Sequence, residues 1–172
     1  ELTGAHYGES QKTDVSLRVI TDHIRSSTFM ICDGILPSNE GRGYVIRRIL
    51  RRAARYGRKL GLVEPFLYKL LPTLNEIMGQ AYPELLREEA KISRIIKGEE
   101  TSFNQTLDRG IALFEEELSL LEKAENNDHI FPGSVAFKLY DTYGFPYDLT
   151  AVMATERGYE VDEAAFEKDM AE

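Results

Sequence analysis

Apolar residues recur every three or four positions along most of the chain, which is the spacing of one face of an α-helix. No stretch alternates strictly between apolar and polar residues, so few strands are expected. Turn-forming residues separate the patterns, which predict helices over residues 13–33, 43–60, 65–78 and 84–124. The fold is therefore predicted to be mainly α, with antiparallel helices, a long central helical segment and little or no sheet.

The last third of the chain mixes short helical patterns with turn residues. Thr13 or Asp14 is placed to cap the first helix of the chain, and Ser134 is placed to cap a short helix over residues 135–140. The run from Asp141 to Pro146 contains Gly and Pro and is predicted to form a turn. Asp162 is placed to cap a last helix.

The composition is that of a globular protein, because 42% of the 172 residues are hydrophobic and 29% are charged. We expect neither a signal peptide nor a membrane-spanning segment. Cys32 is the single cysteine, so an internal disulfide and a cysteine-based zinc site within the chain are excluded. These features favour a cytoplasmic protein with one domain over residues 1–172, which can divide into lobes 1–80 and 81–172.

The net charge of −8 is unevenly distributed. Residues 41–59 contain eight basic side chains and no acidic one, which leaves 13 basic and 29 acidic residues elsewhere, a balance of −16. Affinity for a polyanion depends on a local positive stripe rather than on the average charge. The segment 41–59 is therefore a candidate binding element.

A helical wheel divides this segment into an apolar side and a basic side. The apolar side contains Ile46, Ile49, Leu50, Ala53, Gly57 and Leu60. The basic side contains Arg47, Arg48, Arg51, Arg52, Arg55, Arg58 and Lys59. Arginine predominates, and its planar fork suits two-point contacts to phosphate. The alternative is a solvated face paired with carboxylates from the acidic remainder of the chain.

Other candidate chemistry is sparse. The three histidines have no partner at metal-ligand spacing, and Asp22-His23 has no recognisable nucleophile beside it. Gly41-x-Gly43 lacks the third glycine and the preceding strand of a dinucleotide site, so a turn at the start of a helix is its expected role. We therefore expect no catalytic residue and no metal site in this chain.

One motif runs from Asp33 to Ala53 after Asp22-His23-Ile24-Arg25, and a second runs from Leu139 to Thr150. Together the two motifs resemble the middle region of alanyl-tRNA synthetases. The resemblance covers nearly the whole chain and implies a helical tRNA-recognition domain with the acceptor stem of tRNA-Ala as its partner.

Enzymes of that family activate alanine with ATP and esterify it to the 3′ end of tRNA-Ala. The resemblance implies an upstream catalytic domain that uses ATP with Mg²⁺, and a downstream editing domain that binds zinc, both in the same polypeptide. No cofactor is expected in this segment, which is not expected to catalyse alone.

The resemblance also assigns site residues. It makes Asn39 and Asp141 the readers of a G·U wobble pair, whose guanine amine is exposed in the shallow minor groove of A-form RNA. A carboxylate can accept from that amine, and an amide can both donate and accept. RNA backbone contacts are expected from Arg42, Arg47, Arg48, Arg51, Arg52, Arg55 and Arg58. On residue types alone, Asn39 as a helix cap and Asp141 as a turn cap remain open.

Two other functions fit parts of the sequence. A helical protein–protein interaction module could use the basic stripe to bind an acidic partner. An autonomous enzyme is disfavoured, because the sequence lacks a phosphate-cradling loop, a metal-ligand cluster and a nucleophile–base pair.

Overall fold

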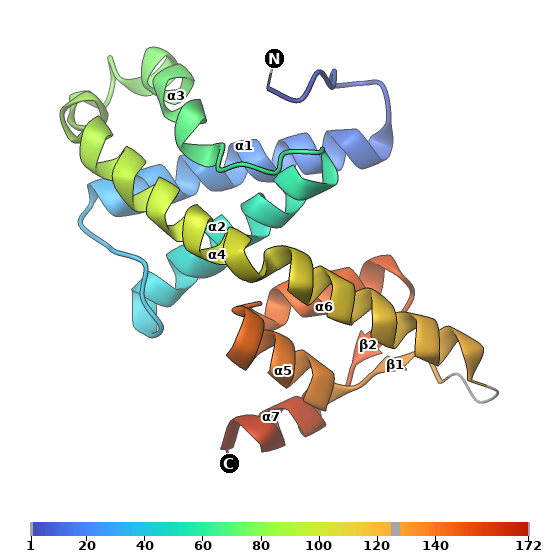
Figure 1. Cartoon of the computed structure of the whole chain (residues 1–172). Helices are drawn as coiled ribbons and strands as arrows, with labels where there is room; N and C mark the ends of the chain where they lie inside the picture. The colour runs from blue at the N-terminus through green and yellow to red at the C-terminus, as the bar shows by residue number, and fades with distance from the viewer. Residues whose placement is uncertain (1, 125–127, 172) are drawn as a thin grey trace. The chain divides into compact units, whose positions relative to one another are not determined.

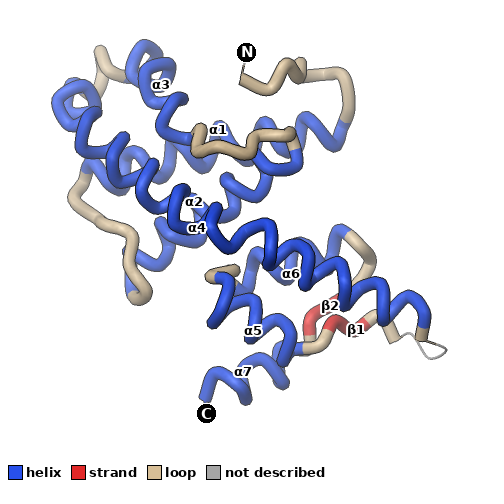
Figure 2. The backbone as a smooth tube through the Cα atoms, in the orientation of Figure 1, coloured by secondary structure: helices blue, strands red, loops and turns tan. Residues whose placement is uncertain are grey.

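The computed structural model describes residues 2–124 and 128–171, and the chain divides into two compact units, Glu1–Asn104 and Gln105–Glu172. Helices dominate both units, and the described residues include only two short strands (Figure 2). The prediction of a mainly α fold with little sheet is confirmed. None of the helices that the described residues form combines the length and apolar character needed to cross a membrane.

Unit 1 contains four α-helices or parts of helices and one 3-10 turn (Figure 1). They are α1 (Gln11–Cys32), α2 (Gly41–Lys59), η1 (Leu67–Leu70), α3 (Leu71–Met78) and the first part of α4 (Pro83–Lys123). The cap expected from Thr13 or Asp14 is wrong, because Ser10 accepts a hydrogen bond from the backbone N–H of Thr13 at 3.1 Å. That bond satisfies a free amide of the first turn, and α1 therefore begins earlier than predicted.

The core of unit 1 forms where α1, α2, η1 and α4 bury their apolar faces. The predicted apolar side of α2 is confirmed, because Ile46, Leu50 and Ala53 are at most 2% exposed. Burial of such aliphatic side chains stabilises a fold by about 1.5–3 kcal/mol each. The buried set is completed by Ile20, Ile24, Ile31, Tyr56, Phe66, Leu67, Leu71, Ile92 and Ile96. Packing of one side of α2 thus fixes which of its side chains face outward or toward α4.

Unit 2 contains the rest of α4 and a small α/β element. It consists of β1 (Ile130–Phe131), α5 (Gly133–Tyr143), α6 (Tyr147–Glu156), β2 (Glu160–Val161) and α7 (Glu163–Ala171). The two strands pair in parallel, with Ile130 opposite Glu160. The core includes Phe114 and Phe131, whose stacked rings lie 4.8 Å apart, and the α5–α6 segment connects the paired strands.

Two predictions for this unit need correction. Ser134 does not cap α5, because the helix begins at Gly133 with Pro132 as its N-cap. Asp141 does not lie in a turn, because α5 continues to Tyr143 and ends at Gly144, whose φ of 70° is left-handed. Glycine adopts that conformation without steric cost and commonly ends a helix. The cap from Asp162 is confirmed, since its Oδ1 accepts from the backbone N–H of Ala165 at 3.0 Å.

Candidate nucleic-acid interface

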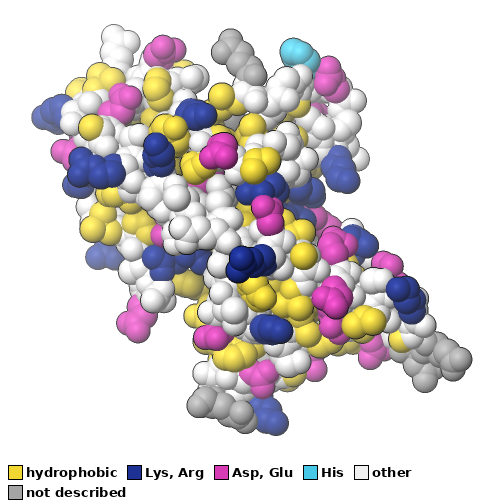
Figure 3. Space-filling view, in the orientation of Figure 1, with side chains coloured by type: hydrophobic (Ala, Val, Ile, Leu, Met, Phe, Trp, Pro, Cys, Tyr) yellow, Lys and Arg dark blue, Asp and Glu magenta, His cyan; other side chains and the backbone are white. Residues whose placement is uncertain are grey.

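The basic residues of α2 differ widely in exposure. Arg42, Arg48 and Lys59 are exposed, whereas Arg47, Arg51, Arg52 and Arg58 are partly buried. Arg55 is 8% exposed, with its guanidinium 5.3 Å from the ring centre of Tyr56, so its expected position on an open cationic face is wrong. Residues 47, 51 and 55 are spaced by four and share one stripe of the helix. On the face in view in Figure 3, basic side chains lie among acidic and apolar ones.

A buried carboxylate of α4 lies against this stripe. Glu99 is 8% exposed, and its Oε1 accepts from Arg47 Nε and from Arg51 Nε, each at 2.9 Å. Its Oε2 accepts from Arg47 Nη2 at 3.3 Å. Burial lowers the pKa of Arg51 from its ordinary value, and the charge of Glu99 opposes that shift. Arg47 and Arg51 therefore share a carboxylate partner inside unit 1.

Asn39 lies exposed in the loop before α2. Its Oδ1 accepts a hydrogen bond from Arg47 Nη1, the third nitrogen of the guanidinium whose other two nitrogens donate to Glu99. It does not cap α2, because the N-cap is Glu40, which makes no side-chain cap bond. Since the amide oxygen has a cationic partner, the amide nitrogen is the group left to donate to a ligand.

The loop that carries Asn39 packs closely on the first turn of α2. A Cβ on Gly43 would overlap Ser38 Oγ and the carbonyl oxygen of Leu36, so only glycine lets the loop approach this closely. Ser38 Oγ also donates to the carbonyl of Glu40 at 2.9 Å. Gly41 begins the helix at a φ of 59°. The expected role of Gly41-x-Gly43 as a turn at the start of a helix is confirmed.

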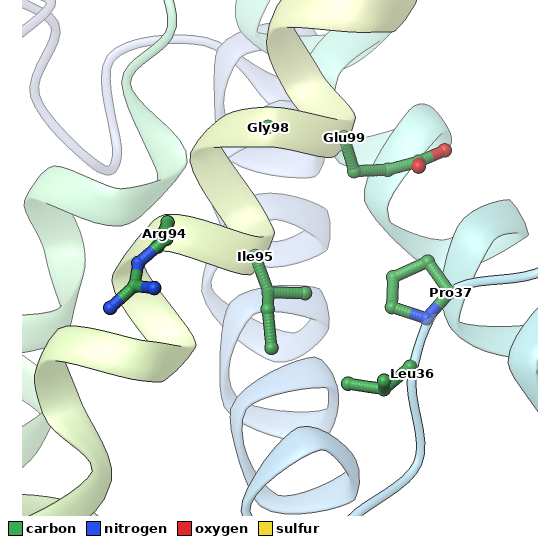
Figure 4. A pocket seen from close by; sticks show the side chains of 6 residues that line it. All are labelled: Leu36, Pro37, Arg94, Ile95, Gly98 and Glu99. Carbon is green, nitrogen blue, oxygen red and sulfur yellow. The ribbon is translucent and has the colours of Figure 1, made fainter.

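A shallow, open groove lies between this loop and α4. Leu36 and Pro37 line one side, and Arg94, Ile95, Gly98 and Glu99 line the other, around about 360 Å³. Figure 4 shows Glu99 leaving α4 on the side of Pro37, whereas Arg94 points away from it. Glu99 thus borders the groove and also holds the arginine that contacts Asn39.

Asp141 lies exposed in the last turn of α5, in unit 2. Its side chain makes no hydrogen bond or ion pair with any described residue, so the alternative role of capping the turn is not observed. Its surroundings are firmly held, because Thr106 Oγ1 donates to the carbonyl of Tyr143 at 2.7 Å and the ring of Phe145 packs on Gly110. A negative charge at a helix C-terminus is disfavoured by about 0.3–1 kcal/mol, which speaks against a stabilising role for Asp141.

Comparison with known proteins identifies the family. The family described as "tRNA synthetases class II (A)" matches residues 1–172. The chain belongs to this family. Proteins named Alanine--tRNA ligase are 56% identical in Hydrogenovibrio crunogenus over 170 residues and 53% identical in Caldicellulosiruptor saccharolyticus over 172 residues. These matches cover 99% and 100% of the chain but only 19% of each relative, so the chain spans about a fifth of their length.

The described part of this class II tRNA synthetase contains no group of three His, Cys, Asp or Glu side chains that could hold a metal ion. His23 Nδ1 lies 3.2 Å from Oδ2 of its neighbour Asp22 on α1. The ring of His129 lies against Tyr159 in unit 2. Asn39, Asp141 and the exposed basic side chains stay the candidates for binding that the sequence suggested.

Glu99 is the site residue that sequence reasoning missed, although the sequence holds a signal for it. The residue lies three positions after Ile96 and four before Phe103, on the apolar seam of α4. A carboxylate on such a seam is expected to have a buried cationic partner. The basic side of α2 offers several, which makes the pairing a reasonable prediction in retrospect.

Proposed function

We propose that the chain is the tRNA-recognition segment of an alanine–tRNA ligase and that it reads a G·U wobble pair in the acceptor stem of tRNA-Ala. The identity of 53–56% to proteins named Alanine--tRNA ligase, along nearly the whole chain, supports this assignment. The parent enzyme would activate alanine with ATP and transfer it to the tRNA. Its ATP–Mg²⁺ and zinc sites are assigned to an upstream catalytic domain and a downstream editing domain.

Asp141 is proposed to accept a hydrogen bond from the guanine amine of the wobble pair. In a G·U pair this amine has no pairing partner in the minor groove, whereas in G·C it is engaged by cytosine. Asp141 is exposed and has no competing partner among the described residues. A carboxylate only accepts hydrogen bonds, which matches an amine and rejects a carbonyl oxygen.

Asn39 is proposed to donate from its amide nitrogen to an acceptor atom in the same groove. The observation that carries this role is the bond from Arg47 Nη1 to Asn39 Oδ1, which holds an exposed, short polar side chain in one orientation. Minor grooves present purine N3 and pyrimidine O2 as acceptors. The amide nitrogen is suited to either of them.

The exposed arginines of α2, Arg42 and Arg48, are proposed to contact the RNA backbone. Arg52 and Arg58 are partly buried and keep the same proposed role at the edge of this surface. Such contacts set the position of a duplex without reading its sequence. Arg47, Arg51 and Arg55 are less suited to this role than their sequence positions suggested, because they are engaged or buried.

Aminoacylation by the complete polypeptide tests the proposal. The kcat/KM values for tRNA-Ala with G·U and with G·C at the recognised pair give a preference ratio. Asp141→Asn keeps the shape of the side chain but replaces one acceptor by a donor. It is expected to lower the ratio by a factor that corresponds to about 1–3 kcal/mol of lost discrimination. Arg48→Ala is expected to lower both kcat/KM values by the same factor.

Glu167→Gln is the matched control, because Glu167 is an exposed carboxylate of α7 in the same unit. It removes one negative charge and should leave the ratio unchanged. An unaltered ratio in Asp141→Asn, with normal activity, would show that Asp141 does not read the pair.

A further inference from the structure

Glu99 is unusual because it places a charge on the packing seam between α2 and α4. Its neighbours at helical spacing, Ile96 and Phe103, are at most 1% exposed. A buried carboxylate is costly unless it is paired and hydrogen bonded. Glu99 meets that requirement with three N–H donors, from Arg47 and Arg51.

Stability alone does not account for this choice of side chains. Replacing a buried ionic cluster by well-packed apolar residues is often neutral or stabilising. What the cluster adds is direction, because the N–H groups of a guanidinium lie in one plane at fixed angles. Glu99 takes two donors of Arg47, Nε and Nη2, and thereby fixes the plane of the fork. The remaining nitrogen of the guanidinium, Nη1, donates a hydrogen bond to Asn39 Oδ1.

We infer that Glu99 is a positioning residue for Asn39 and acts on it through Arg47. This inference rests on the proposed function of Asn39. It assigns Arg47 to the orientation of the amide rather than to a phosphate. A guanidinium beside the amide oxygen opposes rotation of the amide by half a turn, which would present the oxygen to the acceptor atoms of the minor groove. Glu99 therefore contributes to base preference although it need not touch the RNA.

The contact geometry also separates Arg51 from Arg47. Arg51 shares Oε1 of Glu99 and lies over the ring of Phe103, with its guanidinium carbon 5.2 Å from the ring centre. Among the described residues, no hydrogen bond joins Arg51 to Asn39. Arg51 thus holds the carboxylate in place, and Arg47 transmits its position to the loop.

The test measures kcat/KM of the complete polypeptide on tRNA-Ala carrying G·U or G·C. Glu99→Gln keeps the length of the side chain but removes its charge, which loosens the fork of Arg47. The preference for G·U is expected to fall by about threefold to tenfold. The control is Glu88→Gln on the same helix, where Glu88 is 41% exposed and pairs with Lys91 at 3.3 Å. This control should keep the preference of the unmodified enzyme.

A double-mutant cycle distinguishes a purely structural role of Glu99 from its proposed role in positioning Asn39. In an Asn39→Ala background, Glu99→Gln should cause no further change in the preference ratio, because the group that it orients is gone. If Glu99→Gln lowers the melting temperature too far for assay, Arg47→Lys serves as the second variant. Lysine keeps the charge but loses the planar fork, and the ratio should fall as it does for Glu99→Gln.

Different outcomes test the role of Asn39 and the role of Glu99. If Asn39→Ala leaves the preference ratio unchanged, the proposed function of Asn39 is wrong. If Asn39→Ala lowers the ratio but Glu99→Gln and Arg47→Lys lower both kcat/KM values equally, Asn39 reads the pair without help from Glu99. That second result would overturn the inference alone.

Discussion

Replacing Glu100 by glutamine is expected to change how the stability of the chain depends on pH. Glu100 is 2% exposed, and its carboxyl group accepts hydrogen bonds from the backbone N–H groups of Phe66, at 3.1 Å, and Leu67, at 3.0 Å. Burial raises the pKa of Glu100 from its ordinary value of 4.5 to about 7, although these hydrogen bonds favour the charged form. The buried carboxyl group therefore takes up a proton near neutral pH.

Proton linkage gives the direction in which the stability of the fold changes with pH. The folded chain binds this proton more tightly than the unfolded chain, so protonation of Glu100 stabilises the fold. That contribution is fully present below pH 4.5 and is lost as the pH rises through about 7. At about 1.36 kcal/mol per pH unit, the full effect is about 3 kcal/mol. Most of it, about 2–3 kcal/mol, is lost between pH 5 and pH 8.

Urea denaturation of the chain and of Glu100→Gln at pH 5 and pH 8 measures this effect. Glutamine does not ionise, so the free energy of unfolding of the unmodified chain should fall by about 2–3 kcal/mol relative to the variant as the pH rises. The comparison cancels the titration of all other groups that the substitution leaves unaltered. Glu88→Gln, at a partly exposed position on the same helix, should run parallel to the unmodified chain. A difference that is equal at both pH values would show that burial does not shift the ionisation of Glu100.

Three glycine substitutions give further predictions from packing. Gly43→Ala pushes a methyl group into Ser38 and is expected to cost about 1–3 kcal/mol in thermal unfolding and to lower the preference for G·U, because the loop of the proposed reading amide must move. Gly110→Ala places a Cβ 2.6 Å from Cζ of the buried Phe145 and is expected to destabilise the chain by a similar amount. Gly98→Ala on the same helix meets nothing within 4 Å and is expected to stabilise the chain by about 0.5–1 kcal/mol. Equal melting temperatures for the two α4 variants would contradict the packing argument.

The helices were predictable where one face is buried by simple apolar packing. The side of α2 formed by Ile46, Leu50 and Ala53 is buried as its spacing required. The burial of Arg55 was not predictable from the same wheel. A helical wheel separates polar from apolar positions, but it does not say which other helix covers the polar side. That information depends on contacts between residues far apart in the chain.

The turn predicted from Asp141 onward was located only in part. The run that starts at Asp141 does end a helix, but the break occurs at Gly144, where the backbone becomes left-handed. Asp141 precedes the break and keeps helical geometry, so its side chain is presented from a rigid element.

The contact from Arg47 to Asn39 joins residues eight apart and depends on how the loop folds over Gly43. No spacing rule predicts such a contact.

The hold of Glu99 on two arginines also changes what α2 can offer to the ionic atmosphere of a nucleic acid. The single carboxylate of Glu99 offsets one of the two guanidinium charges that it contacts, so Arg47 and Arg51 together displace fewer condensed cations from a phosphate backbone than two free arginines would. Of the eight basic residues in α2, only Arg42, Arg48 and Lys59 are exposed. If α2 binds an acceptor stem as proposed, the entropy gained by releasing counterions is smaller than the basic content of the helix suggests, and more of the binding free energy has to come from short-range contacts.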